Sequence, residues 1–406
     1  MALEGGLLGG AAGGAAGGAA GGAAGGAAGG AAGGPAVLGD TYAMPIFVEA
    51  LNRNRGAVID LGETKPVWDL PLRSSDKTHD HIYRWEPWVR SYLVAYEAIE
   101  SMEFATIFVP HGRLQLPQVT VSVLDWESKH RLPLASIISP PPEVFEKQLA
   151  KVLVWAELRE ERAAEILTQI ENQYCIWGSI VSVHHDRLRH TRELIDAAVQ
   201  MSVLVEMRFK HELACWRPAD YSFQVQPMIT TPGHGSLPSG HCTQSYVVYE
   251  VLKALLNTMR KGDAYQSVNR QFHRVAQRIS TNRVVAGVHF PVDNVAGRIL
   301  GKVLGEYFVY LCGYKWKGWD DRSAAKEKPW HYGEFDGRRF DSNLEFDPAS
   351  QPVCGTVPML PFYKYEQPTY GRKKLLAPLV KTERAPILKR LFQQAQEECG
   401  YLGISF

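Results

Sequence analysis

The sequence lacks an excess of charge of either sign. Its 406 residues include 44 Lys and Arg against 43 Asp and Glu, which leaves a formal net charge of +1. A surface with this balance has no general electrostatic attraction for nucleic acid or for an anionic membrane. We therefore expect neither of these partners, and we expect any functional positive charge to be concentrated at one site.

Cysteine is scarce and long apolar runs are missing. The six cysteines form no CxxC pair, which favours a reducing compartment and gives no structural zinc site. The most apolar stretch, residues 295–314, carries Arg298, Lys302 and Glu306 at four-residue steps and predicts an amphipathic helix, not a membrane span. Because residues 1–10 contain Glu4 and glycine pairs, they do not resemble a secretory signal. These features together predict a cytoplasmic protein.

Large side chains are absent from residues 9–34, where a GGAA pattern repeats. Such a segment can bury little and is expected to form a tail or linker. The C-terminal region is rich in Trp, Tyr and Pro, which suggests an arm that packs on the body or on a second subunit, so we expect a homo-oligomer. The expected division is a tail at 1–34, mixed short elements at 35–142, a helical core at 143–313, and an arm with a terminal helix at 314–406.

Helical spacing of apolar residues dominates the middle of the chain. It predicts one long helix over about 143–173, a second from about 186 to 209, and a last one over 385–399. Residues 118–124 are strand-like. The histidines near Asp80 and Asp186 are better explained as loop and helix-capping residues than as metal ligands.

Lys210 and Arg217 form the first of three separated segments rich in groups that bind anions. Six residues separate the two, and Pro218 follows. The ammonium of a lysine is a compact positive charge, and the planar guanidinium of an arginine can donate two parallel hydrogen bonds. Both groups bind phosphate-like oxygens. The same residues at a helix end could instead be solvated or balance the helix dipole.

The second segment is Pro238-Ser239-Gly240-His241, which precedes apolar residues at helical spacing up to 256. Ser239 is expected to cap this helix, and Gly240 allows close approach to free N–H groups where the helix dipole favours negative charge. His241 can donate or accept a proton near neutral pH. The alternative is a plain serine cap followed by a partly exposed histidine.

The third segment runs from Arg283 to Asp293 and includes His289, just before a helix that Pro291 can start. Asp293 is placed to accept a hydrogen bond from one ring nitrogen of His289, which leaves the other nitrogen free to act as a nucleophile or a ligand. The alternative is a buried structural histidine.

Taken together, K-x6-RP, PSGH and R-x3-G-x-H-x3-D, in this order, resemble the signature of the vanadium-dependent haloperoxidases and the related phosphatidic acid phosphatase superfamily. The resemblance covers residues 210–293 and the helices on either side. It implies an all-α helical bundle with the site at its centre. The irregular C-terminal arm, expected from composition, lies outside the resemblance.

The resemblance also implies a role for each matched residue. The oxyanion cradle for vanadate, or for phosphate in the same site, would consist of Lys210, Arg217, Ser239, Gly240 and Arg283. His289 would be the vanadium ligand and His241 the acid–base residue, with Asp293 holding His289.

Two activities fit such a site. A haloperoxidase would use hydrogen peroxide to oxidise a halide to hypohalous acid, which reacts with small organic acceptors. Bromide is the expected halide. An acid phosphatase would form a phosphohistidine on His289, with His241 protonating the departing alcohol and then activating water. A non-catalytic oxyanion-binding or assembly protein is the third alternative.

His234 favours the first activity. Algal bromoperoxidases similarly have a histidine at this position and a glutamine soon after the acid–base histidine, as Gln244 is here, whereas fungal chloroperoxidases have Phe in place of His234. A loop residue between two glycines is the alternative for His234. Met207 departs from the bulky or charged side chain that haloperoxidases commonly place one turn before the lysine, which bears on halide selectivity.

Overall fold

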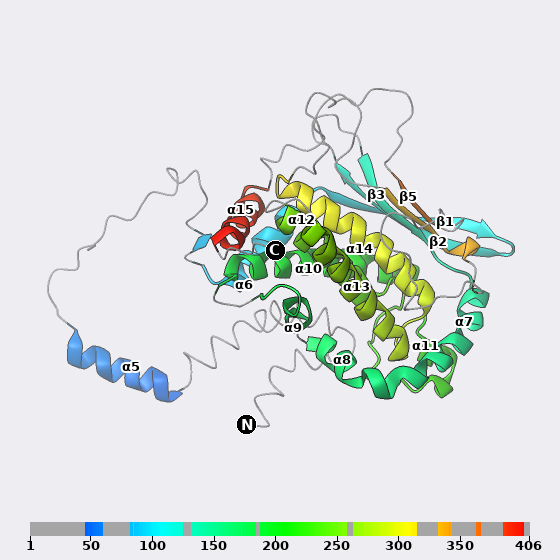
Figure 1. The fold of residues 1–406 in the computed structure, drawn as a ribbon, viewed down its shortest axis with the longest axis horizontal. Coiled ribbons are helices and arrows are strands. Elements are labelled where there is room, and N and C mark those ends of the chain that lie inside the picture. Colours follow the sequence, from blue (N-terminus) through cyan, green and yellow to red (C-terminus); the bar gives the residue numbers. More distant parts are fainter. Residues whose placement is uncertain are drawn as a thin grey trace.

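The computed structural model describes residues 45–59, 82–83, 85–124, 131–171, 173–183, 187–257, 263–314, 332–340, 342, 363–366 and 385–401. Within them, a helical bundle lies against one side of a twisted sheet (Figure 1). The expected 1–34 tail, Asp80 and Asp186 with the histidines beside them, and Trp316, Trp319 and Trp330 lie outside the described residues.

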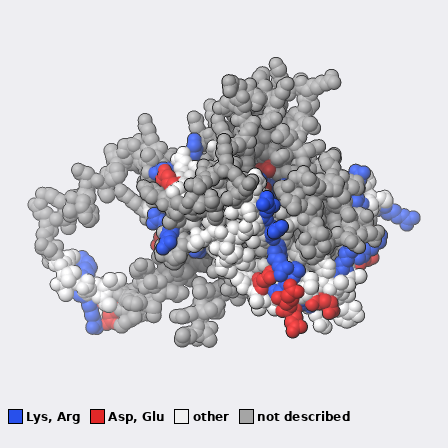
Figure 2. Space-filling view, in the orientation of Figure 1, with Lys and Arg blue, Asp and Glu red and all other residues white. Residues whose placement is uncertain are grey.

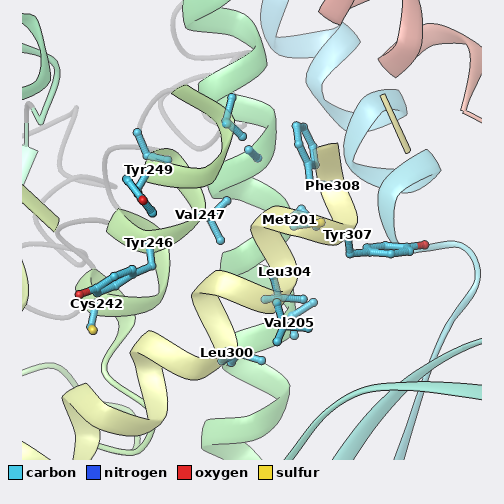
Figure 3. Packing of buried hydrophobic residues seen from close by; sticks show 14 of the residues in the cluster. Met201, Val205, Cys242, Tyr246, Val247, Tyr249, Leu300, Leu304, Tyr307 and Phe308 are labelled. Carbon is cyan, nitrogen blue, oxygen red and sulfur yellow. The ribbon is translucent and has the colours of Figure 1, made fainter. Parts of the chain in front are cut away.

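Four long helices form the bundle. They are α10 (Arg189–Leu213), α12 (Gly240–Asn257), α13 (Asp263–Val285) and α14 (Pro291–Leu311). Met201 and Val205 of α10 meet Val247 of α12 and Leu300 and Leu304 of α14 in one buried cluster (Figure 3). The predicted helical bundle is therefore confirmed, and the three segments rich in anion-binding groups lie at the ends of these helices.

Glycines at every fourth position of α14 let this helix pack closely on α12. A Cβ at Gly297 would lie 2.7 Å from the carbonyl oxygen of Ser239, and one at Gly305 would lie 2.7 Å from Cβ of Glu250. At Gly301 it would meet the carbonyl oxygen of Thr243 and would lie 2.9 Å from Cβ of Tyr246. The close approach of α14 to α12 therefore requires residues without a side chain at these three positions.

Replacing Gly301 with alanine is expected to lower the free energy of unfolding by about 1–3 kcal/mol, because the methyl group must push two packed helices apart. Thermal unfolding followed by circular dichroism measures this. The matched control is Gly400→Ala on the last helix, where an added Cβ has no atom within 4 Å and should raise stability slightly. If both variants were stabilised alike, the close packing of α12 and α14 would be wrong.

The other described helices lie before, between and after these four in the sequence. The preceding elements are α5 (Pro45–Val58), α6 (Pro87–Ile99), α7 (Pro142–Trp155), η3 (Ala156–Leu158), α8 (Arg159–Glu171) and α9 (Tyr174–Gly178), and the others are α11 (Pro218–Tyr221), η4 (Phe223–Val225), η6 (Gly337–Arg339) and α15 (Pro386–Tyr401). The prediction of one helix over 143–173 was wrong in its continuity, because the tighter turn η3 separates α7 from α8. The predicted terminal helix is confirmed as α15.

Two carboxylates fix α15 to the bundle. Glu398 accepts hydrogen bonds from the backbone N–H groups of His190 at 2.8 Å and Thr191 at 2.9 Å, at the start of α10. Glu97 of α6 accepts in turn from Leu388 N at 2.9 Å, at the start of α15. Each carboxyl accepts hydrogen bonds from N–H groups that have no partner within their own helix. Glu398 therefore joins α15 to α10, and Glu97 joins α6 to α15.

Among the described residues the sheet has five strands in the order β1-β2-β3-β4-β5: β1 (Met102–His111), β2 (Leu114–Leu124), β3 (Arg131–Ile138), β4 (Tyr332–Asp336) and β5 (Tyr363–Glu366). All neighbours are antiparallel except β3 and β4, which are parallel. Val119, Val121 and Val123 of β2 are buried toward the helices. The all-α expectation holds for the site-bearing bundle, which dominates the fold, but the sheet is an addition to it. The expected division of the chain stays a prediction.

The surface of the described helices carries mixed charge. On the face shown in Figure 2, acidic and basic side chains lie next to each other. Arg278, for example, contacts Glu165 at 2.6 Å and Glu161 at 3.7 Å. The sequence predicts that Arg298, Lys302 and Glu306 form the charged face of an amphipathic helix. This is only partly correct for α14, because Glu306 is buried while Arg298 and Lys302 are half-buried. None of the helices in the described ranges is both long and apolar enough to cross a membrane.

Candidate active site

Helix ends bring the three predicted segments together. Lys210 lies in the last turn of α10 and Arg217 just before α11, while His241 lies in the first turn of α12. Arg283 lies in the last turn of α13, and His289 lies two residues before the start of α14. The side chains of Lys210, Arg217 and Arg283 are at most 2% exposed. Three buried cations in one region need a negative partner, because burial of unpaired charge is costly.

His289 is held in one orientation by two charged neighbours. Its Nδ1 lies 3.0 Å from Oδ2 of Asp293, and its Nε2 lies 3.4 Å from Nη1 of Arg217. Because a guanidinium can only donate, Nε2 is the acceptor and the proton belongs on Nδ1, which donates to Asp293. Burial, followed by the charge of Arg217, lowers the pKa of His289 well below its usual value. The ring is therefore neutral and presents the lone pair of Nε2.

Asp293 has more partners than the sequence suggested. Its Oδ2 also accepts hydrogen bonds from the Phe290 backbone N–H at 2.9 Å and from the hydroxyl of Ser236. Burial raises the pKa of Asp293 to about 6, and the Ser236 hydrogen bond opposes this rise. Asp293 thus remains ionised at neutral pH and can hold the His289 proton. Sequence reasoning missed Ser236, which carries no motif signal beyond its place in the loop before Pro238.

His241 pairs with Arg283. Its Nε2 lies 3.3 Å from Nη1 of Arg283 and is again the acceptor. Burial first, and Arg283 second, lower the pKa of His241 well below its usual value. Arg283 is fixed in turn by Gln169 of α8, whose Oε1 lies 2.8 Å from Nη2, and by the carbonyl of Ile166 at 3.2 Å. Gln169 had no signal in the sequence, because it belongs to a helix that precedes the motifs.

Lys210 directs its ammonium to backbone oxygens. It donates to the carbonyls of Gly235 and Ser236, both at 3.1 Å, and of Pro238 at 2.5 Å. An ammonium has three protons, and three acceptors occupy them. Lys210 therefore shapes the loop before α12. Burial, followed by the charge of Arg217, lowers the pKa of Lys210 to about 7.

Arg217 holds the same loop from the other side. Its Nε donates to the carbonyl of His234 at 3.0 Å, and its Nη1 donates to the carbonyl of Val288 at 2.7 Å. Its Nη2 lies 3.3 Å from Nδ1 of His234, so the half-buried His234 is at the edge of the cluster. Burial lowers the pKa of Arg217 to about 10 and that of Arg283 to about 9, so both stay charged at neutral pH.

Part of the chain that contains these residues is similar to known proteins. Residues 195–317, which contain the whole cluster, match the PAP2 superfamily. This part of the chain is therefore a PAP2 superfamily domain. Members of the superfamily are enzymes and include both phosphatases and haloperoxidases. A vanadium-dependent bromoperoxidase of Ascophyllum nodosum is 28% identical over 94 residues, which are 18% of this chain and 17% of that protein.

Two donors in the PAP2 domain suit the oxygens of a tetrahedral anion. The hydroxyl of Ser239 and Nε of Arg283 are buried and have no hydrogen-bond partner among the described residues. A buried donor without a partner costs about 1–3 kcal/mol, so both favour an acceptor ligand. The expected Ser239 cap is wrong in one respect: its carbonyl accepts from Thr243 N at 3.0 Å, but its hydroxyl makes no cap hydrogen bond. The donor set fits vanadate or phosphate.

Glu206 is a further buried residue of the PAP2 domain that sequence reasoning missed. Met207, the position expected to bear on halide selectivity, is half-buried. Its neighbour Glu206 is only 1% exposed and contacts Gln244. A carboxyl in a helix of otherwise apolar spacing is an available signal for such a residue. In the described part of the chain, no three His, Cys, Asp or Glu residues are grouped to hold a bare metal cation.

Proposed function

We propose that this protein is a vanadate-dependent haloperoxidase that oxidises bromide with hydrogen peroxide. The observation that carries the proposal is the neutral His289, held by Asp293 and presenting Nε2 beside Arg217 in a buried cluster of cations. The similarity to the bromoperoxidase of Ascophyllum nodosum supports the peroxidase activity over the phosphatase activity.

The residues of the site have separate roles in this proposal. Nε2 of His289 would bind vanadium. Ser239 and the Gly240 amide would donate hydrogen bonds to the vanadate oxygens, whose negative charge Lys210, Arg217 and Arg283 would balance. Bound vanadate would supply the centre at which hydrogen peroxide is activated for two-electron oxidation of the halide. Nε2 of His241 would accept a proton from hydrogen peroxide and return it to the product.

Acid phosphatase activity is the second candidate, favoured by the same lone pair of His289. Nε2 would attack phosphorus, and Asp293, which lies 3.0 Å from Nδ1, would stabilise the positive charge that develops on the ring. His241 would then protonate the leaving alcohol. The cytoplasmic location, the homo-oligomer, and the use of small organic acceptors stay predictions.

Two assays on protein freed of bound anions separate these activities. With vanadate added, we expect bromide-dependent oxidation by hydrogen peroxide and no turnover of a generic phosphomonoester. Phosphomonoester hydrolysis that vanadate inhibits would replace the proposal with the phosphatase. Bound phosphate without either activity would indicate the non-catalytic alternative.

A further inference from the structure

Glu206 lies against the start of α12 from the side of α10. It precedes Lys210 by one helical turn, and its Oε1 accepts a hydrogen bond from Nε2 of Gln244 at 3.0 Å. The same oxygen lies 2.8 Å from the place that a Cβ on Gly240 would occupy. The carboxyl therefore packs against the turn whose backbone N–H groups face the proposed anion.

The second carboxyl oxygen is unsatisfied. Oε2 of Glu206 is buried and has no hydrogen-bond partner among the described residues. The nearby ammonium of Lys210 contacts three carbonyl oxygens. An ionised carboxyl in this position would repel an anion bound at the adjacent helix start, whereas a protonated one would not.

We propose that Glu206 takes up a proton when a tetrahedral oxyanion binds in the site. The inference rests on the proposed function, because it requires that the cluster binds such an anion. Linkage makes the effect reciprocal: if anion binding favours the protonated form of Glu206, protonation of Glu206 strengthens anion binding by the same factor.

The direction of the pH dependence follows from the surroundings of Glu206. Burial raises the pKa of Glu206 to about 7, and the charge of Lys210 opposes this rise. The carboxyl is therefore protonated below neutral pH and ionised above it, so anion affinity falls as the pH rises. Cys242 of α12 also interacts with Glu206, but burial raises the pKa of Cys242 to about 12, so the thiol stays neutral. Lys210 interacts in turn with Arg217 and Asp293.

Isothermal titration calorimetry with inorganic phosphate, in buffers of different ionisation enthalpy, tests the proposal on the full chain. The comparison is wild type against Glu206→Gln, which keeps the size of the side chain and removes the titratable proton. Phosphate titrates in both proteins. Because Lys210 interacts with Glu206 and burial lowers the pKa of Lys210 to about 7, the difference reports the proton uptake of these two groups together. We expect wild type to take up close to one more proton at about pH 8 than the variant. Its affinity relative to the variant should fall on the order of tenfold between about pH 6 and about pH 8.

Two further variants distinguish this role from a structural one. Glu212→Gln makes the same chemical change on the same helix, at a carboxyl that pairs with Arg208 at 2.9 Å instead of facing the site. It should leave proton uptake unchanged. The exchange Glu206→Gln with Gln244→Glu keeps one carboxyl and one amide in contact, and should restore the pH dependence.

The possible failures are distinct. If wild type bound no phosphate, both the proposed function and this inference would be wrong. If wild type and Glu206→Gln bound phosphate with the same proton uptake at both pH values, only the role of Glu206 would be wrong. Loss of pH dependence in Glu212→Gln would also contradict it.

Discussion

Replacing His289 with alanine is expected to abolish retention of vanadate and to weaken phosphate binding by about 100-fold or more. The variant removes the acceptor nitrogen that faces Arg217 and leaves Asp293 without the ring N–H that it receives at 3.0 Å. The anion then loses a direct ligand, and the buried charge of Asp293 is less well compensated. Equilibrium dialysis with vanadate and calorimetry with phosphate measure the loss.

Two controls support this interpretation. His211→Ala removes an exposed imidazole next to Lys210 and should bind both anions as wild type does. Asp293→Asn keeps His289 but weakens its orientation, and we expect an intermediate loss of affinity. Equal anion binding by wild type and a correctly folded His289→Ala would remove the ligand role of His289.

Replacing His241 with alanine is expected to lower turnover by about 10²–10⁴-fold while anion affinity changes only a few-fold. His241 is neutral, so its removal takes no charge from the cradle, and Arg283 remains fixed by Gln169 and the carbonyl of Ile166. What is lost is a nitrogen that can accept and return a proton. Steady-state kinetics and phosphate calorimetry on the same preparation measure both effects.

The contrast between the two histidines is the informative result. His289→Ala should lose binding and turnover together, whereas His241→Ala should lose turnover alone. If His241→Ala lost anion binding to the same extent as His289→Ala, His241 would be part of the cradle and the acid–base assignment would be wrong.

The helices of the bundle could be predicted because their signals are local, whereas the convergence of the three motifs was implied by the family resemblance. Helical spacing predicts α10 and α12, and the start of α14 is indicated by Pro291. The contact between His289 and Asp293 follows from their four-residue separation. Each of these features depends on residues that are close in sequence.

The contacts that sequence reasoning missed join distant parts of the chain. Gln169 contacts Arg283 across 114 residues, and β3 pairs with β4 although nearly two hundred residues separate them. Lys210 turns to backbone carbonyls, which carry no sequence signal at all. Such contacts are decided by tertiary packing, which overrides local preference.

The position of phosphate or vanadate soaked into crystals of the protein tests the central claim most directly. We expect one tetrahedral anion within bonding reach of Nε2 of His289, with the Ser239 hydroxyl and Nε of Arg283 directed at its oxygens. An anion bound elsewhere, or a crystal in which the two imidazoles face away from a common space, would contradict the account.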